Sequence, residues 1–576
     1  MTASAITAGA ATQNGFRLLS RRHVIGGLVV LAIGLVTLTP VAFLIFSSFN
    51  IAAPGEATSY GLDNWHAAFA DDRIFDSIWT TLRLVFARLG ISIPAGILFA
   101  WLLARTDMPG GSSLEFLFWI AFFTPALPLT VGWILLLDPE NGLINTLLAG
   151  LPFAVPKFDI FSFWGIVWVH LTATSVPVAV ILFTPAFRQM NAALEDSARM
   201  CGASALTTLR RITVPILIPA ILPASAIMFI RSLEAFEIEL LLGSPVGIFV
   251  YSTRIFDLID EVPPGYGMAT ALGTLFLFVV LALAVLYALV IRGRRFTTVT
   301  GQAFSTERVR LGRWRWPALA LCSLYLFTSF GLGLIFLVLS SFMRRFGFFD
   351  IANPFTFEHW TELLSDPVLL SSLGNSLLLG TATALVGVVL FSLVAYVVVR
   401  SQLTGRNLVD MMAWLPWAVP GVLMGLALVW LFLATPLRTV LYGTIAGLVV
   451  AMVIKELPVA VQLLKGGFLR IGNELEEAAR VCGAGWSMTY WRVLLPLVSP
   501  VLITVAVLSF QAAVRDIASV VFLYDNDSRP LSILMLEYSF SGELERGAAV
   551  GILLVAMIAV MAYIARRLGY RAGTSS

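Results

Sequence analysis

Long apolar stretches separated by short polar segments run through the whole chain. Twelve of them are long enough to cross a bilayer, which takes about 20 residues of helix. They are predicted at 24–48, 77–104, 115–137, 161–185, 213–240, 268–291, 316–343, 371–399, 411–434, 440–464, 494–520 and 547–565. The pattern therefore predicts an all-α polytopic membrane protein with about twelve transmembrane helices.

The composition agrees with this prediction and excludes other classes. Of the 576 residues, 59% are hydrophobic and 12% are charged, against roughly 25% charged in soluble domains. Three cysteines are too few for a disulfide framework. The four histidines are scattered, so we expect no metal cluster, no catalytic triad and no bound cofactor.

The distribution of charge predicts the orientation. With the N-terminus inside, the inner segments hold 24 Arg and Lys residues and the outer segments hold 8. Acidic residues run the other way, with 9 inside and 20 outside. Because Arg and Lys concentrate in cytoplasmic loops, and an even number of spans returns the chain to its starting side, we predict that both termini are cytoplasmic.

The chain is predicted to be an internal duplication. Trp65 and Asp71 recur as Trp360 and Asp366, an offset of 295 that persists to Arg105 and Arg400 and to Gly110 and Gly405. Further along, 194–219 aligns with 475–500 at an offset of 281, with 11 of 26 positions identical. Both halves place six helices in the same order and orientation. The predicted domains are 1–291 and 316–576, joined by a basic linker at 292–315.

The most similar part of the two halves is a polar loop after the fourth helix of each half. We call 194–215 and 475–496 the signature loops. Each begins with a helix-forming stretch and reaches a glycine, Gly202 or Gly483, which permits a turn between two short helices. A proline follows at the start of the next span. Lipid packing does not explain two similar loops, so a rigid surface for a partner protein is predicted, in preference to an interfacial loop without a partner.

The two loops resemble the E-A-A-x3-G-x9-I-x-L-P signature of permease subunits of bacterial ABC importers. Both copies keep its spacing. The second reads Glu477, Ala478, Ala479, Gly483, Val493, Leu495 and Pro496, after Glu476; the first reads Asp196, Ser197, Ala198, Gly202, Ile212, Val214 and Pro215, after Glu195. The whole chain resembles a tandem fusion of two six-helix type I permease domains, most similar to the ferric-iron uptake group, whose relatives handle thiamine, phosphonates and polyamines.

This resemblance implies a function and a set of partners. In the family each signature loop docks on an ATPase subunit, so two ATPase copies are expected, with a periplasmic solute-binding protein, membrane lipid and no nucleic acid. The location implied is the bacterial inner (plasma) membrane. A phosphate-binding loop needs G-x4-G-K-[ST], and none of the lysines, Lys157, Lys455 and Lys465, lies in one. The chain is therefore predicted not to be an enzyme.

Ionisable residues inside spans are candidates for the transport pathway, because they are costly in a bilayer. Arg88 is expected near the midplane, and Arg231, Glu234, Glu237 and Glu239 late in the fifth span. At the repeat offset, Glu234 and Ala235 correspond to Arg515 and Asp516. Such charges either line a polar pathway or form an intramembrane ion pair, for example Arg231 with Glu234.

Two prolines, Pro177 and Pro458, also correspond at offset 281 and predict helix kinks, either hinges or structural bends. Lys455 and Glu456 flank the second, and His170 shares a span with the first. A lone histidine of this kind is more often a packed, hydrogen-bonded residue than a ligand. The alternative function is a proton-coupled secondary transporter with two six-helix halves, which would not need paired signature loops.

Overall fold

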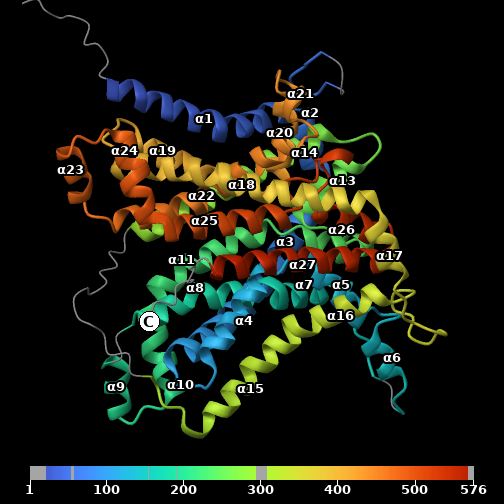
Figure 1. The fold of residues 1–576 in the computed structure, drawn as a ribbon. Coiled ribbons are helices and arrows are strands. Elements are labelled where there is room, and N and C mark those ends of the chain that lie inside the picture. Colours follow the sequence, from blue (N-terminus) through green and yellow to red (C-terminus); the bar gives the residue numbers. More distant parts are fainter. Residues whose placement is uncertain (1–20, 53–56, 153–154, 191–192, 293–307, 568–576) are drawn as a thin grey trace, which may run out of the picture.

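The computed structural model describes residues 21–52, 57–152, 155–190, 193–292 and 308–567. It is helical throughout this part of the chain (Figure 1), with only isolated β-bridges. Most of the predicted linker, 293–307, lies outside the described residues.

The first half contains fourteen α-helices and two π-helical segments in the order below, with one short 3-10 turn. They are α1 Arg21–Ser48, α2 Asp63–Ala70, α3 Asp72–Arg105, α4 Gly111–Phe123, α5 Ala126–Leu137, α6 Leu143–Ala149, α7 Phe163–His170, η1 Leu171–Ser175, α8 Val176–Arg188, α9 Ala193–Met200, α10 Ala205–Thr208, η2 Leu209–Thr213, α11 Val214–Leu233, α12 Glu237–Leu242, η3 Ser244–Val246, α13 Tyr251–Asp260 and α14 Tyr266–Arg292.

The second half repeats this order with small changes. Its elements are η4 Gly312–Trp314, α15 Arg315–Leu326, η5 Phe327–Gly331, α16 Leu332–Phe342, α17 Glu358–Ser365, α18 Pro367–Arg400, α19 Arg406–Trp414, η6 Leu415–Ala418, α20 Gly421–Leu433, α21 Arg438–Leu441, α22 Ile445–Leu469, α23 Glu474–Val481, α24 Trp486–Thr489, η7 Tyr490–Leu494, α25 Leu495–Arg515, η8 Asn526–Ser528, α26 Leu531–Phe540 and α27 Leu544–Arg567.

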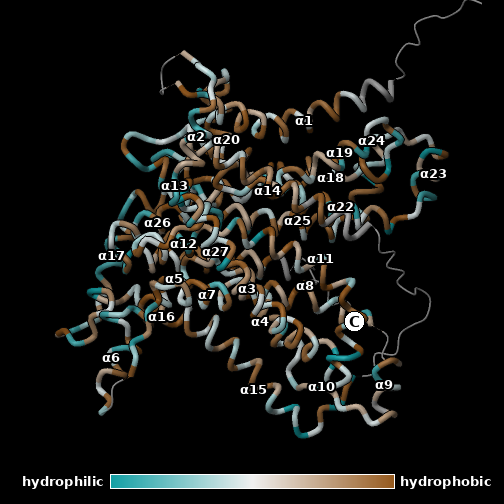
Figure 2. The backbone as a smooth tube through the Cα atoms, turned by 180° about the vertical axis from the view of Figure 1, so that it is seen from behind, coloured by the Kyte–Doolittle hydropathy of each residue, from teal (hydrophilic) through white to brown (hydrophobic). Residues whose placement is uncertain are grey.

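The expected number of spans is confirmed within the described residues. Ten helices are long and apolar enough to cross a membrane, and two bent helix pairs bring the number to as many as twelve. The long helices are mostly hydrophobic, and polar residues gather at the two ends of the bundle (Figure 2). The signature loops, as α9–α10 and α23–α24, lie at one end, and α6, α13 and α17 lie at the other (Figure 1).

Two predicted spans, 115–137 and 411–434, are broken rather than straight. The α4–α5 pair bends by 96°, and α19–η6 bends against α20 by 108°. Pro125 and Pro420 lie within the two breaks, directly before α5 and α20. Because proline has no N–H to donate and disfavours a helical residue before it, the helix ends there. Hydropathy alone did not detect these bends.

Several helix ends also differ from the prediction. The fifth span, predicted as 213–240, ends at Leu233, and Glu237 and Glu239 lie on the separate helix α12. The eleventh ends at Arg515 rather than 520, where the Asp516 carboxylate accepts a hydrogen bond from Ser519 N at 2.8 Å and stabilises a turn. A hydropathy window does not register such local capping.

The first helix of each half packs against the opposite half. Helix α1 contacts α19 and α20, and Gly26 lies against the backbone of Thr404. Reciprocally, α16 contacts α5, where a Cβ on Gly132 would lie 2.1 Å from Gly333 O. Small residues permit this close helix packing in membranes. The two halves are therefore interlocked by exchange of their first helices.

Candidate functional site

The signature loops have the predicted helix–turn–helix form in both halves. The short helices α9 and α23 end two residues before Gly202 and Gly483, whose φ angles are +83° and +82°. A left-handed backbone of this kind favours glycine. A Cβ added at either glycine would meet no atom within 4 Å, so the requirement for glycine within this chain comes from the backbone angle alone.

The first acidic residue of each loop points inward rather than to the surface. In the first loop, Arg105 Nη2, at the end of α3, donates to Glu195 Oε2 at 2.6 Å, and Thr213 Oγ1 donates to Glu195 Oε1 at 2.8 Å. Glu195 is 1% exposed. A buried carboxylate held in this way fixes the loop helix to α3 and to the segment that leads into α11.

The second loop repeats this contact more loosely. Arg400 Nε, at the end of α18, lies 3.7 Å from Glu476 Oε1. The Arg400 guanidinium also donates to Phe468 O at 2.6 Å, and to Ile471 O and Asn473 Oδ1. Sequence reasoning aligned Arg105 with Arg400 but did not connect them to the loops. The sequence signal for this contact was an arginine at the end of the second predicted span in both halves.

The other signature residues lie outside these contacts. The Ser197 hydroxyl donates to Ala193 O; Asp196 and Ala479 are half-buried, and Glu477 and Ala478 are exposed. Ala198 is buried. Ile212 and Val493 lie half-buried in the π-helical segments, and Pro215 and Pro496 lie in the first turn of α11 and α25.

Each loop exposes large apolar side chains at its surface. Met200 and Val481, which end the two loop helices, are 83% and 89% exposed. Leu206, Trp486 and Met488 are exposed on the short helices that follow. Apolar side chains gathered on a rigid loop at one end of the bundle are typical of a protein-binding surface.

A buried charge network occupies the first half. His170 Nε2 donates to Glu239 Oε1 at 2.6 Å, and Arg88 Nη1 lies 3.5 Å from the same oxygen. All three residues are buried. The expectation that His170 is a packed, hydrogen-bonded residue is confirmed, and Arg88, near the middle of α3, has a partner that lies on α12.

The two prolines behave differently. Pro177 follows the π-helical segment η1, whereas α22 continues through Pro458 without interruption. A π-helical turn often marks a functional position in a helix. It begins directly after His170, and Tyr325 from the second half donates to Leu171 O at 2.8 Å. Sequence reasoning missed Tyr325.

A second group of charges lies where the halves meet. Lys455 donates to Asp516 within the second half, and Arg231 pairs with Glu234 at 3.3 Å within the first. The ion pair considered from the i,i+3 spacing therefore forms. Arg515 donates to Phe122 O at 3.3 Å, a residue of the other half.

Two carboxylates in this group have no partner among the described residues. Glu237 and Glu456 form no hydrogen bond or ion pair there, although Glu456 is only 9% exposed. The charges of both act on Arg515. Among the residues that the structure describes, no group of three or more His, Cys, Asp or Glu side chains could hold a metal ion.

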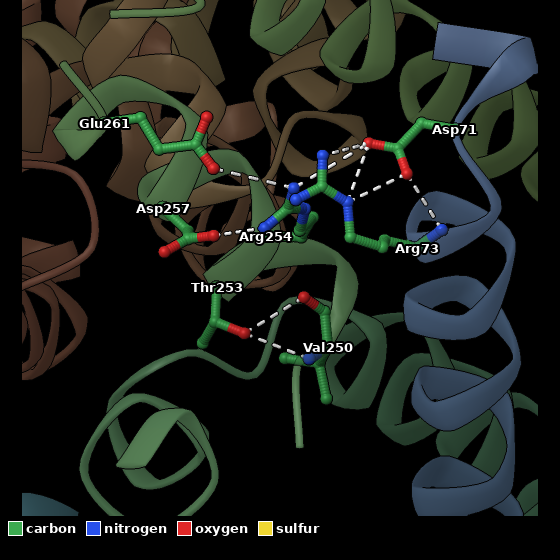
Figure 3. A network of polar contacts seen from close by, with 7 residues as sticks. All are labelled: Asp71, Arg73, Val250, Thr253, Arg254, Asp257 and Glu261. Carbon is green, nitrogen blue, oxygen red and sulfur yellow. Dashed lines mark hydrogen bonds and ion pairs between the residues drawn. The ribbon is translucent and has the colours of Figure 1, made fainter. Parts of the chain in front are cut away.

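At the end opposite the signature loops, a polar network joins α3 to α13 (Figure 3). Arg73 donates to Asp71 at 2.9 Å, and the buried Arg254 lies between Asp71, Asp257 and Glu261. The hydrogen bonds from Arg73 hold the pKa of Asp71 below its ordinary value of 3.8. Asp71 also caps α3 by accepting from Arg73 N.

Comparison with known proteins identifies the family. The family described as "Binding-protein-dependent transport system inner membrane component" matches residues 92–296 and 387–572. The chain belongs to this family and contains its domain twice. The tandem permease architecture and the multi-pass membrane character predicted from the sequence are therefore confirmed.

Several curated relatives are similar over most of this chain. The ferric transport system permease protein FbpB of Actinobacillus pleuropneumoniae is 26% identical over 70% of this chain and 58% of its own length. The probable ABC transporter permease protein y4fN of Sinorhizobium fredii is 25% identical over 84% of this chain and 85% of its own. A putative ferric transport system permease protein of Haemophilus influenzae is 26% identical over 70% of this chain and 63% of its own.

The matched region thus spans less than two thirds of two of these three relatives. Among solved structures, a bacterial ABC transporter for import of alginate aligns at 21% identity over 49% of this chain and 98% of that chain, with a TM-score of 0.40.

Proposed function

We propose that this chain forms the permease of a bacterial ABC importer, in which each half receives one ATPase subunit on its signature loop. The observation that carries the proposal is the pair of matching loops. Each presents a short helix, a left-handed glycine and exposed apolar side chains at the same end of the bundle. A proton-coupled secondary transporter binds no ATPase subunits and would not need two such surfaces.

The orientation follows from the same assignment. The signature loops face the cytoplasm, where ATP is present, and both termini lie on that side. The opposite end, with the network around Arg254, faces a periplasmic solute-binding protein. Binding of ATP draws the ATPase subunits together, and their differential affinity for the two states of the permease drives alternating access. ATP hydrolysis takes place on the separate subunits.

The solute that we propose is ferric iron, with thiamine, a phosphonate or a polyamine as alternatives. Two of the relatives described above carry ferric transport in their names. Glu237 and Glu456 form no hydrogen bond or ion pair among the described residues and so offer two carboxylates to a cationic solute. The charges of Lys455 and Arg515 act on both carboxylates, and that of Arg231 acts on Glu456. The candidate pathway comprises this group with Arg231, Glu234, Lys455 and Asp516.

The test uses substitutions in the signature loops. Gly483→Val and Glu477→Lys should leave membrane insertion intact, because neither residue is in a span. Both should weaken copurification of the ATPase subunit and abolish uptake. Gly202→Val and Asp196→Lys should act in the same way, with a smaller effect because the first copy departs further from the signature.

Gly542→Val is the matched control. Gly542 has a φ of +79° and open space around it, as Gly483 does, but lies at the opposite end of the bundle. Gly542→Val should therefore impose the same backbone strain, about 1 kcal/mol or more, and leave binding of the ATPase subunit unchanged. ATPase pull-down from detergent extract and uptake of radioactive ferric iron at matched permease levels are the measurements. Wild-type ATPase binding by all four loop variants would sink the proposal.

A further inference from the structure

The two bent spans break at equivalent positions of the repeat. At the offset of 295, Pro125 corresponds to Pro420 and Phe122 corresponds to Trp417. In each half the aromatic residue lies three positions before the proline, at the end of the first helix of the bent pair. The bend and its aromatic residue are therefore a duplicated feature of this fold.

The bend in the first half leaves carbonyl groups without partners in their own helix. Thr124 N is the last donor to α4, because Pro125 has no N–H. Two side chains from the second half supply the missing donors. Gln511 Nε2 donates to Phe123 O at 3.2 Å, and Arg515 Nη1 donates to Phe122 O at 3.3 Å.

Gln511 and Arg515 are four residues apart on α25 and so lie on one face of it. A cation at a helix C-terminus also stabilises the negative end of the helix dipole. The end of α25 is therefore a specific cap for the end of α4, supplied by the opposite half.

An arginine also lies over the aromatic ring at each bend, and the two contacts are crossed. Arg515 from the second half lies 6.0 Å from the ring centre of Phe122. Arg231 from the first half lies 5.4 Å from the ring centre of Trp417. A guanidinium over an aromatic ring within about 6 Å is attracted by it. Each half thus holds the bend of the other.

The helices that carry these arginines lead directly to the signature loops. The helical run that ends in α11 extends over Ala205–Leu233, and the run that ends in α25 extends over Trp486–Arg515. At 1.5 Å per residue, each is a rod of about 45 Å. Its first turn belongs to a signature loop and its last turn contacts the opposite bend.

We propose that Arg515, Gln511 and Arg231 are positioning residues that tie the signature-loop helix of one half to the bent span of the other. Displacement of one signature loop by its ATPase then moves the bend of the opposite half, so that neither half can change state alone. The inference rests on the proposed function and adds to it a route between the two halves.

The test uses the permease reconstituted with its ATPase subunit and binding protein in lipid vesicles. Arg515→Ala should reduce the ratio of binding-protein-stimulated to basal ATP hydrolysis by about tenfold, because the cap of α4 is lost. Arg515→Lys keeps a cation at the helix end and should retain part of the ratio. Phe122→Leu removes only the ring and is the variant to use if Arg515→Ala does not fold.

Thr504→Val is the matched control on α25, because its hydroxyl bonds only to its own helix, at Pro500 O. It should keep the wild-type ratio. A purely static tie would lower the melting temperature of Arg515→Ala and leave the ratio unchanged, and that result would overturn the inference. If the binding protein does not stimulate ATP hydrolysis by the complex of the wild-type chain with its ATPase subunit, the proposed function fails instead.

A double-mutant cycle tests the crossed connection. Arg515→Lys should be non-additive with Gly483→Ala, in the turn that precedes the same rod, and additive with Gly202→Ala, in the turn that precedes the other rod. The measured quantity is the logarithm of the uptake rate. Equal coupling to both glycines would contradict the crossed route.

Discussion

The two halves share their helices but not their buried charges. The network of Arg88, His170 and Glu239 in the first half corresponds, at the repeat offsets, to Thr383, Ala451 and Val520 in the second. All three of these residues are buried and uncharged. Conversely, Lys455 and Asp516 correspond to Thr174 and Ala235.

This difference separates what the fold requires from what it tolerates. The same arrangement of helices forms with buried charges at one set of positions in the first half and at a different set in the second. Burying charges is expensive even when they are paired, and stability alone does not account for their presence in one copy. The comparison can be tested by exchanging the charges between the two halves.

The largest effect is expected from breaking the first-half network. Arg88→Gln leaves Glu239 without its cation and should destabilise the protein by roughly 3–5 kcal/mol, as for other broken buried pairs. The triple variant Arg88→Thr, His170→Ala and Glu239→Val installs the residues of the second half and should be more stable than Arg88→Gln. Melting temperature in detergent measures both.

Uptake by the triple variant decides the role of the network. If the charges are only structural, the triple variant folds and transports. If they line the pathway, it folds, retains ATPase binding and does not transport. A triple variant less stable than Arg88→Gln would show that the halves are not interchangeable in this respect.

A smaller effect should distinguish the two signature loops. Glu195→Gln disrupts contacts of 2.6 and 2.8 Å, and about 3 kcal/mol of local stability should be lost. Glu476→Gln should cost about 1 kcal/mol, because Arg400 keeps its carbonyl partners. Hydrogen exchange of α9 and α23, in permease without the ATPase, measures each. The expectation is contradicted if Glu476→Gln lowers the protection of α23 by more than Glu195→Gln lowers that of α9.

The smallest effect concerns the caps of α3 and α18. Asp71→Ala should cost about 1 kcal/mol, and slightly more than Asp366→Ala, because Asp71 also binds Arg73. Since the pKa of Asp71 is lowered by folding, its contribution is present above its ordinary pKa and is lost as the pH falls through the lowered value. The difference in melting temperature between the wild type and Asp71→Ala should therefore be smaller at pH 3 than at pH 7. Equal differences at the two pH values would contradict this account.

Much of the fold could be predicted because it depends on regular patterns. Hydropathy located the spans, and the offsets of 295 and 281 located the repeat. The bends could not be read in this way, although Pro125 and Pro420 marked them, because a window average across a short break stays apolar. The end of α11 at Leu233 was missed for the same reason.

The site was predictable only where it has a local signature. The spacing of Gly202 and Gly483 indicated the loops directly. The pairing of Glu195 with Arg105 joins residues 90 positions apart, and the contact of Arg515 with Phe122 joins residues 393 positions apart. Contacts between distant helices depend on packing, and no pattern in a single sequence encodes them.

The exchange of first helices has a consequence for synthesis of the protein. Ribosomes deliver the chain from its N-terminus, so α5 enters the membrane long before α16, its partner at Gly333. Until about 200 further residues have emerged, the face of α5 around Gly132 must be covered by lipid or by the insertion machinery. The first half therefore reaches its final packing only after the second has begun to insert, and maturation proceeds as one event for the whole chain.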